Sequence, residues 1–65
     1  MTPQINGRYY YTAAPRDCIV YIGIKNNCHE FALASDPYRK PHFIFLQSYL
    51  NLIKTEDEFL IEQIK

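Results

Sequence analysis

Several kinds of residue and segment are scarce in this chain of 65 residues, and each scarcity excludes a class of protein. Gly7 and Gly23 are its only glycines, so it has no glycine-rich loop of the kind that holds phosphate groups. No stretch approaches the run of about 18 apolar residues that a transmembrane helix needs. The first residues, MTPQINGRYYY, lack the basic and apolar segments of a signal peptide. We therefore expect a cytoplasmic protein.

Cysteine is limited to Cys18 and Cys28, and we predict that both are free thiols. The hairpin predicted below puts them at different levels and on opposite faces, whereas a disulfide needs Cα atoms within about 7 Å of each other. Zinc sites usually combine cysteines and histidines in close pairs, but the side chains of Cys28 and His29 would point to opposite faces of a strand. No catalytic motif surrounds these residues. We predict no metal, no cofactor and no enzymatic activity.

Net charge is zero, with seven Lys and Arg residues against seven Asp and Glu residues. This balance weakens an electrostatic case for binding nucleic acid. The charges are unevenly placed, because residues 1–54 carry six basic against three acidic residues, whereas residues 55–65 carry one basic against four acidic. The acidic cluster suits the start of a helix, where the helix dipole favours negative charge. It also allows an interpretation as a mildly basic body that carries an acidic helix.

What the chain does contain is enough apolar material for a core. Its residues are 48% hydrophobic and 15% aromatic, which is typical of a folded globule rather than a disordered chain. A domain of this size buries only about 60% of the surface that its unfolded chain exposes. We therefore predict a single domain over residues 1–65 with a thin margin of stability, which oligomerisation would supplement.

Residues 18–35 give the clearest local pattern, which is a β-hairpin. Two β-rich runs flank Asn26-Asn27, and asparagine tolerates the positive φ that a two-residue turn requires. An uninterrupted register pairs Lys25 with Cys28 and Ile22 with Phe31. It also pairs Ile24 with His29 and Val20 with Leu33. The predicted core face then consists of Val20, Ile22, Ile24, His29, Phe31 and Leu33, and the opposite face includes Tyr21 and Lys25.

The segment RYYYTA, residues 8–13, predicts a further strand ahead of this hairpin. A four-residue loop over 14–17 would pair Tyr10 with Tyr21 and Tyr9 with Ile22. Tyr9 and Tyr11 would then enter the core, while Tyr10 would lie on the opposite face. A loop with an odd number of residues would reverse this assignment.

Residues 42–65 show apolar residues at heptad spacing, which favours helix. Thr55 stands three residues before Glu58, the pattern of a capping box at a helix start. We predict two helical segments, 42–53 and 56–65, and leave open the alternative that HFIFLQS forms a fourth strand. The predicted fold class is α+β: a three-stranded antiparallel β-meander followed by one or two C-terminal α-helices packed on the sheet.

This predicted fold leaves more apolar surface than one small core can cover, which favours a protein partner. We expect a small adaptor, regulator or inhibitor that forms a homodimer or binds a larger protein. A compact accessory protein of a phage or mobile element would have this size. The alternative is a single-stranded nucleic-acid-binding module that uses an aromatic and basic sheet face. The residues expected to bind a partner are Arg8, Tyr10, Tyr21 and Lys25, with a second patch of Phe45, Leu52 and Phe59.

Overall fold

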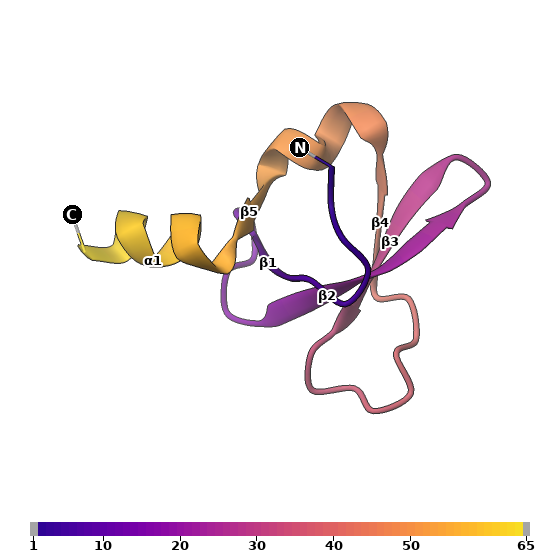
Figure 1. Cartoon of the computed structure of the whole chain (residues 1–65), viewed down its shortest axis with the longest axis horizontal. Coiled ribbons are helices and arrows are strands. Elements are labelled where there is room, and N and C mark those ends of the chain that lie inside the picture. The colour runs from indigo at the N-terminus through magenta and orange to yellow at the C-terminus, as the bar shows by residue number, and fades with distance from the viewer. Residues whose placement is uncertain (1, 65) are drawn as a thin grey trace.

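The computed structural model describes residues 2–64, with side chains through residue 61, and consists mostly of one β-sheet (Figure 1). The five antiparallel strands follow the order β4-β3-β2-β1-β5. The elements along the chain are β1 (Arg8–Tyr11), β2 (Cys18–Lys25), β3 (Cys28–Leu33), β4 (Phe43–Leu46), the 3₁₀ helix η1 (Gln47–Leu52), β5 (Ile53–Thr55) and α1 (Glu56–Ile64). The predicted three-stranded meander with one or two helices is therefore wrong, because the sheet has five strands.

The segment predicted as a first helix, 42–53, contains a strand, a 3₁₀ helix and the start of another strand. The alternative of a fourth strand is confirmed by β4. Its four residues alternate between the core and the outside, with Phe43 and Phe45 directed inward and Ile44 and Leu46 exposed. This two-residue period is that of a strand, and the inward aromatic rings find partners in the core.

The β2–β3 hairpin forms at the predicted turn. Asn26 and Asn27 both have positive φ, 52° and 64°. The predicted pairs of Ile24 with His29 and of Lys25 with Cys28 are confirmed. Beyond them the register shifts by one residue between Tyr21 and Gly23, so that Tyr21 rather than Ile22 lies opposite Phe31. The predicted pairs Ile22–Phe31 and Val20–Leu33 are therefore wrong.

This shift is a β-bulge at Ile22, and it exchanges the two faces of the first half of β2. Ile19 and Tyr21 enter the core cluster, whereas Val20 pairs with Ala32 on the opposite face, where both side chains are nevertheless buried. Gly23 has a φ of 134°, a backbone conformation that residues with a side chain rarely adopt. The glycine therefore permits the bulge.

Strand β1 pairs in a register three residues from the predicted one. Tyr9 lies opposite Ile19 and Tyr10 lies opposite Cys18, so the connection to β2 spans residues 12–17 rather than 14–17. Tyr9 is nevertheless buried in the core and Tyr11 packs against it, as predicted. The predicted faces of Tyr9 and Tyr11 are correct because two errors cancel. The wrong register of β1 and the missing bulge in the predicted β2 each invert the faces once.

The sheet curls around an aromatic core. Strands β1 and β4 are separated by β2 and β3 in the sheet, yet the ring of Tyr11 lies 5.4 Å from that of Phe43 and 5.0 Å from that of Phe45. Side chains on two strands that are separated by two others can meet only if the sheet bends toward its inner face. Leu50 of η1 and Ile53 of β5 complete the buried cluster.

Helix α1 confirms the second predicted helix, except that Lys65 lies outside the described residues. The Thr55 hydroxyl accepts a hydrogen bond from the Glu58 N–H at 3.2 Å, and the Glu58 carboxylate accepts one from the Thr55 N–H at 3.1 Å. The capping box is thus complete. The hydrogen bond from the Thr55 N–H lowers the pKa of Glu58, because it favours the charged carboxylate. In Figure 1 the helix extends from one end of the sheet, and the β2–β3 turn lies at the other.

The bulge predicts a specific response to substitution at Gly23. Gly23→Ala should lower the free energy of unfolding by about 1–3 kcal/mol, because alanine is strained at this φ. The added Cβ would meet only ordinary contact, 3.7 Å from Ile5, so steric overlap is not the cause. A synthetic chain with D-alanine at position 23 is the control, since its preferred φ has the opposite sign. Equal stability of the Gly23→Ala protein and the wild type in denaturant titrations would contradict this account.

Candidate functional site

The seven residues expected to bind a partner do not form one surface. Arg8 and Tyr10 lie on the outer face of β1, beside α1. Tyr21 is only 7% exposed and belongs to the core, and Lys25 is exposed next to the β2–β3 turn. In the second predicted patch, Phe45 is buried in the core and Leu52 is partly buried at the end of η1. Phe59 lies against Tyr10.

Tyr10 and Phe59 hold the helix against the sheet. Their rings are stacked, with centroids 4.2 Å apart and planes 12° apart. Beside them Arg8 Nε lies 3.4 Å from a carboxylate oxygen of Glu56. Burial, followed by the nearby Cys18, raises the pKa of Tyr10. Phe59 therefore covers one face of the Tyr10 ring, and this aromatic pair connects β1 to α1.

Tyr21 belongs to a hydrogen-bonded chain that connects three elements. The Tyr21 hydroxyl lies 2.8 Å from His29 Nδ1, and His29 Nε2 lies 2.7 Å from the Gln47 side-chain oxygen. Because that oxygen can only accept, Nε2 carries a hydrogen and donates it, and in the neutral tautomer with this hydrogen Nδ1 accepts from the tyrosine. These two hydrogen bonds connect η1 to β2 and β3 and give both nitrogens of the buried imidazole a partner. Burial raises the pKa of Tyr21 above 10.0.

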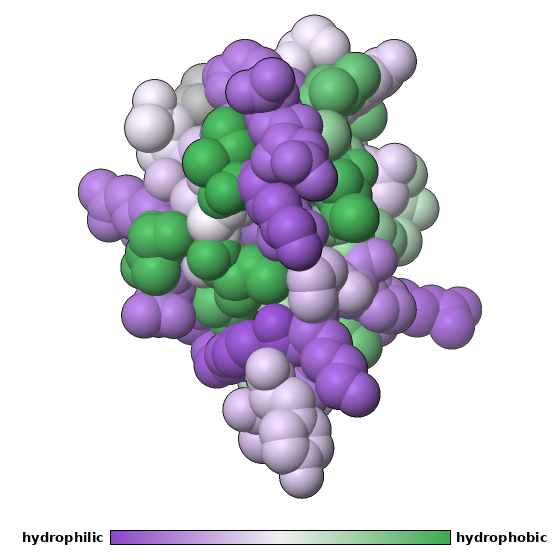
Figure 2. Space-filling view, turned by 90° about the vertical axis from the view of Figure 1, so that its right-hand side faces the viewer, coloured by the Kyte–Doolittle hydropathy of each residue, from purple (hydrophilic) through white to green (hydrophobic). Residues whose placement is uncertain are grey.

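Part of the exposed apolar surface lies along β4, which is an edge of the sheet; the other large apolar side chains that are exposed are Ile5, Ile24, Tyr38, Tyr49, Leu60 and Ile61. Ile44 is 60% exposed and Leu46 is 52% exposed, and β4 has β3 as its single strand neighbour within residues 2–64. We call Ile44, Leu46 and the free side of this strand the β4 edge. The space-filling view of the molecule's end with the β2–β3 turn shows apolar surface on both sides of a hydrophilic ridge (Figure 2).

Sequence reasoning did not assign the β4 edge as a site, because the segment was interpreted as helix. The available signal was the run FIFL, a short apolar stretch of β-forming residues after Pro41. Such a run without charged residues indicates a strand as readily as a buried helix segment.

The residue types that can bind a metal do not cluster in the described part of the chain. Between residues 2 and 64, no group of three or more His, Cys, Asp or Glu residues is placed to hold a metal ion. Cys18 and Cys28 are half-buried and free. No helix in the described segment is long and apolar enough to cross a membrane. No family model matches the sequence, and no curated protein or solved structure matches it either.

The hydrogen-bonded chain predicts that Tyr21 supports the fold. Tyr21→Phe should lower the free energy of unfolding by about 1–3 kcal/mol, because buried Nδ1 of His29 loses its donor. Tyr38→Phe is the matched control, since Tyr38 is 81% exposed.

The same substitution should change the alkaline stability of the protein. Burial raises the pKa of Tyr21 in the folded state above 10.0. The neutral side chain therefore contributes fully to the free energy of unfolding below pH 10.0, and this contribution is lost as the pH rises through the folded-state pKa. Tyr21→Phe should therefore remove part of the alkaline loss of stability that denaturant titrations across this range record. An unchanged stability and an unchanged alkaline profile would exclude the role assigned to Tyr21.

Proposed function

We propose that this chain is a non-enzymatic interaction protein whose β4 edge accepts an extended strand from a protein partner. The observation that carries the proposal is an unpaired, uncharged edge strand with two exposed aliphatic side chains, Ile44 and Leu46. Strand addition at a sheet edge obtains affinity from main-chain hydrogen bonds and specificity from alternate side chains.

The composition of β4 supports this function because monomeric proteins usually protect such edges. Common protection consists of charged side chains, proline within the strand, bulges or a covering element. None of the four residues Phe43–Leu46 is charged or proline, and the bulge of this sheet lies in β2. The β5 edge is shorter, with three residues, and leads directly into α1. Of the two edges, β4 is the better template for another strand.

The partner segment should present apolar side chains two residues apart, so that they lie beside Ile44 and Leu46 on the outer face. A second copy of this chain meets that requirement through its own β4. An antiparallel pair of two β4 strands centred on Phe45 would place Ile44 of each copy opposite Leu46 of the other. All four of these side chains would then lie on the same face of the joined sheet. Zero net charge adds no long-range repulsion between copies. An adaptor, regulator or inhibitor would use the same edge on a larger protein.

Binding of single-stranded nucleic acid has less support. The module predicted for it needs exposed aromatic rings on which bases stack. Tyr21 lies in the core, and Tyr10 is stacked on Phe59.

We also propose that the protein acts in the cytoplasm. Two free, partly accessible thiols suit a reducing compartment, where cysteines remain unpaired.

The β4 edge can be tested by reversing its apolar character. Leu46→Lys should abolish self-association that sedimentation equilibrium detects in the wild type across a concentration series, because it adds a charge to the joined strands. Ile61→Lys is the control, since Ile61 is 58% exposed on α1, away from β4. Thermal unfolding of both variants confirms that they remain folded. A monomeric wild type that also shows no shift of β3 and β4 amides with a peptide of residues 41–48 would contradict the proposal.

A further inference from the structure

The segment that leads into β4 presents basic side chains at one end of the β4 edge. Arg39 and Lys40 follow each other there, and both are exposed. Among the side chains described through residue 61, neither of them makes an ion pair. Lys40 stands three residues before Phe43, so the chain keeps its Cα atom within about 11 Å of the start of β4. A partner strand that continued beyond this end of β4 would therefore pass close to these charges.

Hydrogen bonds within the loop fix the position of these basic residues. The Asp36 carboxylate accepts from the Tyr38 N–H at 2.9 Å and from the Lys40 N–H at 3.0 Å. The Arg39 guanidinium donates to the Ala34 carbonyl oxygen at 2.9 Å. Because the loop is already ordered in the free protein, a partner would not bear the entropy cost of ordering it.

Asp36 offsets only part of the positive charge. It is the single acidic residue of the segment 34–42, whereas Arg39 and Lys40 are both basic. The Tyr38 and Lys40 N–H groups lower the pKa of Asp36, because they favour the charged carboxylate. Asp36 is therefore ionised at neutral pH, and the segment keeps an excess of one positive charge.

Two other charged residues of the sheet lie farther from a strand added to β4. Glu30 lies on β3 opposite Ile44, so β4 would separate it from the partner by about 10 Å in total at the usual strand spacing. Lys25 lies on β2 and would be about 14 Å away, which exceeds the Debye length of about 8 Å at physiological salt.

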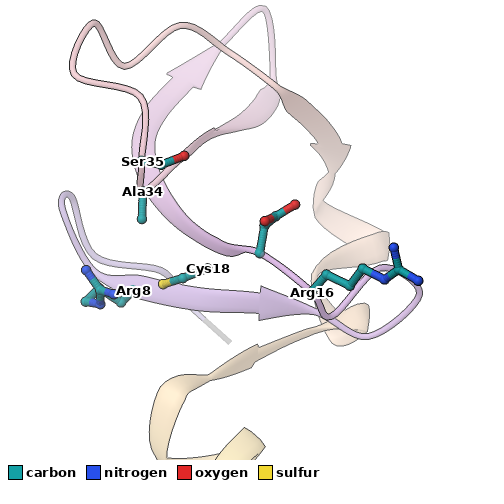
Figure 3. Close-up of a pocket in the computed structure, with 6 residues that line it drawn as sticks. Arg8, Arg16, Cys18, Ala34 and Ser35 are labelled. Atoms are coloured by element: carbon teal, nitrogen blue, oxygen red, sulfur yellow. The ribbon is translucent and has the colours of Figure 1, made fainter.

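The other two arginines do not add to the charge at β4. Arg8 and Arg16 line a cavity of about 350 Å³, and their side chains point away from each other (Figure 3). Arg8 is paired with Glu56 at 3.4 Å, and β2 and β3 separate its strand from β4. Arg39 and Lys40 are therefore the basic residues placed to meet a strand added to β4.

We propose that the protein partner is an extended segment that pairs antiparallel with β4 and carries acidic residues directly after its paired strand. This inference rests on the proposed function of the β4 edge. In antiparallel order the partner strand ends beside Phe43, so the residues that follow it run along the segment with Arg39 and Lys40. Antiparallel pairing continues the pattern of the sheet and is slightly more stable per residue than parallel pairing. Opposite charges at this end would fix the direction and register of the partner.

A second copy of this chain meets only the apolar part of this requirement. The residues that follow its β4 form η1, Gln47–Leu52, which contains no acidic residue. The charge at the start of β4 therefore favours a different protein over a second copy.

The test uses three synthetic peptides that share a core of alternating valine and threonine, and it follows the β3 and β4 amide chemical shifts of the full chain. The first peptide carries two aspartates after the core, the second carries them before the core, and the third carries two asparagines after it. The first two have the same composition and charge, so general attraction affects them equally. We expect the first to bind about two- to fivefold more tightly than the others, the effect of an exposed ion pair. In 1 M salt, where the Debye length is about 3 Å, this preference should disappear.

Two substitutions locate the charge that the partner meets. Lys40→Gln should remove most of the preference for the first peptide. Lys25→Gln removes the same charge from another exposed lysine and should leave the preference intact. Thermal unfolding confirms that both variants remain folded.

The possible failures of this inference and of the proposed function can be told apart. Equal affinity of the three peptides would contradict the acidic partner but not strand addition at β4. Tighter binding of the second peptide would contradict the antiparallel direction. An absence of β3 and β4 shifts with every peptide would contradict this inference and the proposed function together.

Discussion

The bulge at Ile22, permitted by the positive φ of Gly23, decides which side chains form the core. Side chains of a strand alternate, so one extra residue sends every residue on one side of the bulge to the other face. Tyr21 thereby enters the core, where its hydroxyl reaches His29 and so connects to η1. The bent sheet also brings Tyr11 of β1 against the aromatic rings of β4. A regular strand would place the other face of β2 inward and remove these contacts.

Features set by a few neighbouring residues could be predicted from the sequence. The Asn26-Asn27 turn and the Thr55–Glu58 capping box each depend on local backbone preferences, and both form. The bulge could not be assigned, because Gly23 marks a possible irregularity without fixing its position or its effect on pairing. β4 was interpreted as helix, because heptad spacing and two-residue alternation coincide over a stretch this short. Without the bulge the sequence predicts Tyr21 on the surface, and with a helix over 42–53 it predicts no β4 edge.

The placement of the aromatic residues also explains which surfaces remain for binding. Tyr9, Tyr21, Phe31 and Phe45 belong to the buried cluster, and Tyr10 is stacked on Phe59. The exposed apolar side chains that remain include Ile44 and Leu46 at the β4 edge, together with Tyr38 and Tyr49.

The central claim, that the bulge sets the core face, has a direct test in solution by nuclear magnetic resonance. Both backbone polar groups of Tyr21 bond to residues 6 and 7, the N–H to Gly7 and the carbonyl to Asn6, so Tyr21 and Phe31 form a pair without mutual hydrogen bonds. Cα atoms in such pairs approach to about 4.5 Å, which brings their α-protons together. We predict a strong Hα–Hα Overhauser effect between Tyr21 and Phe31. The same effect between Ile22 and Phe31 instead would show an uninterrupted register and contradict the account.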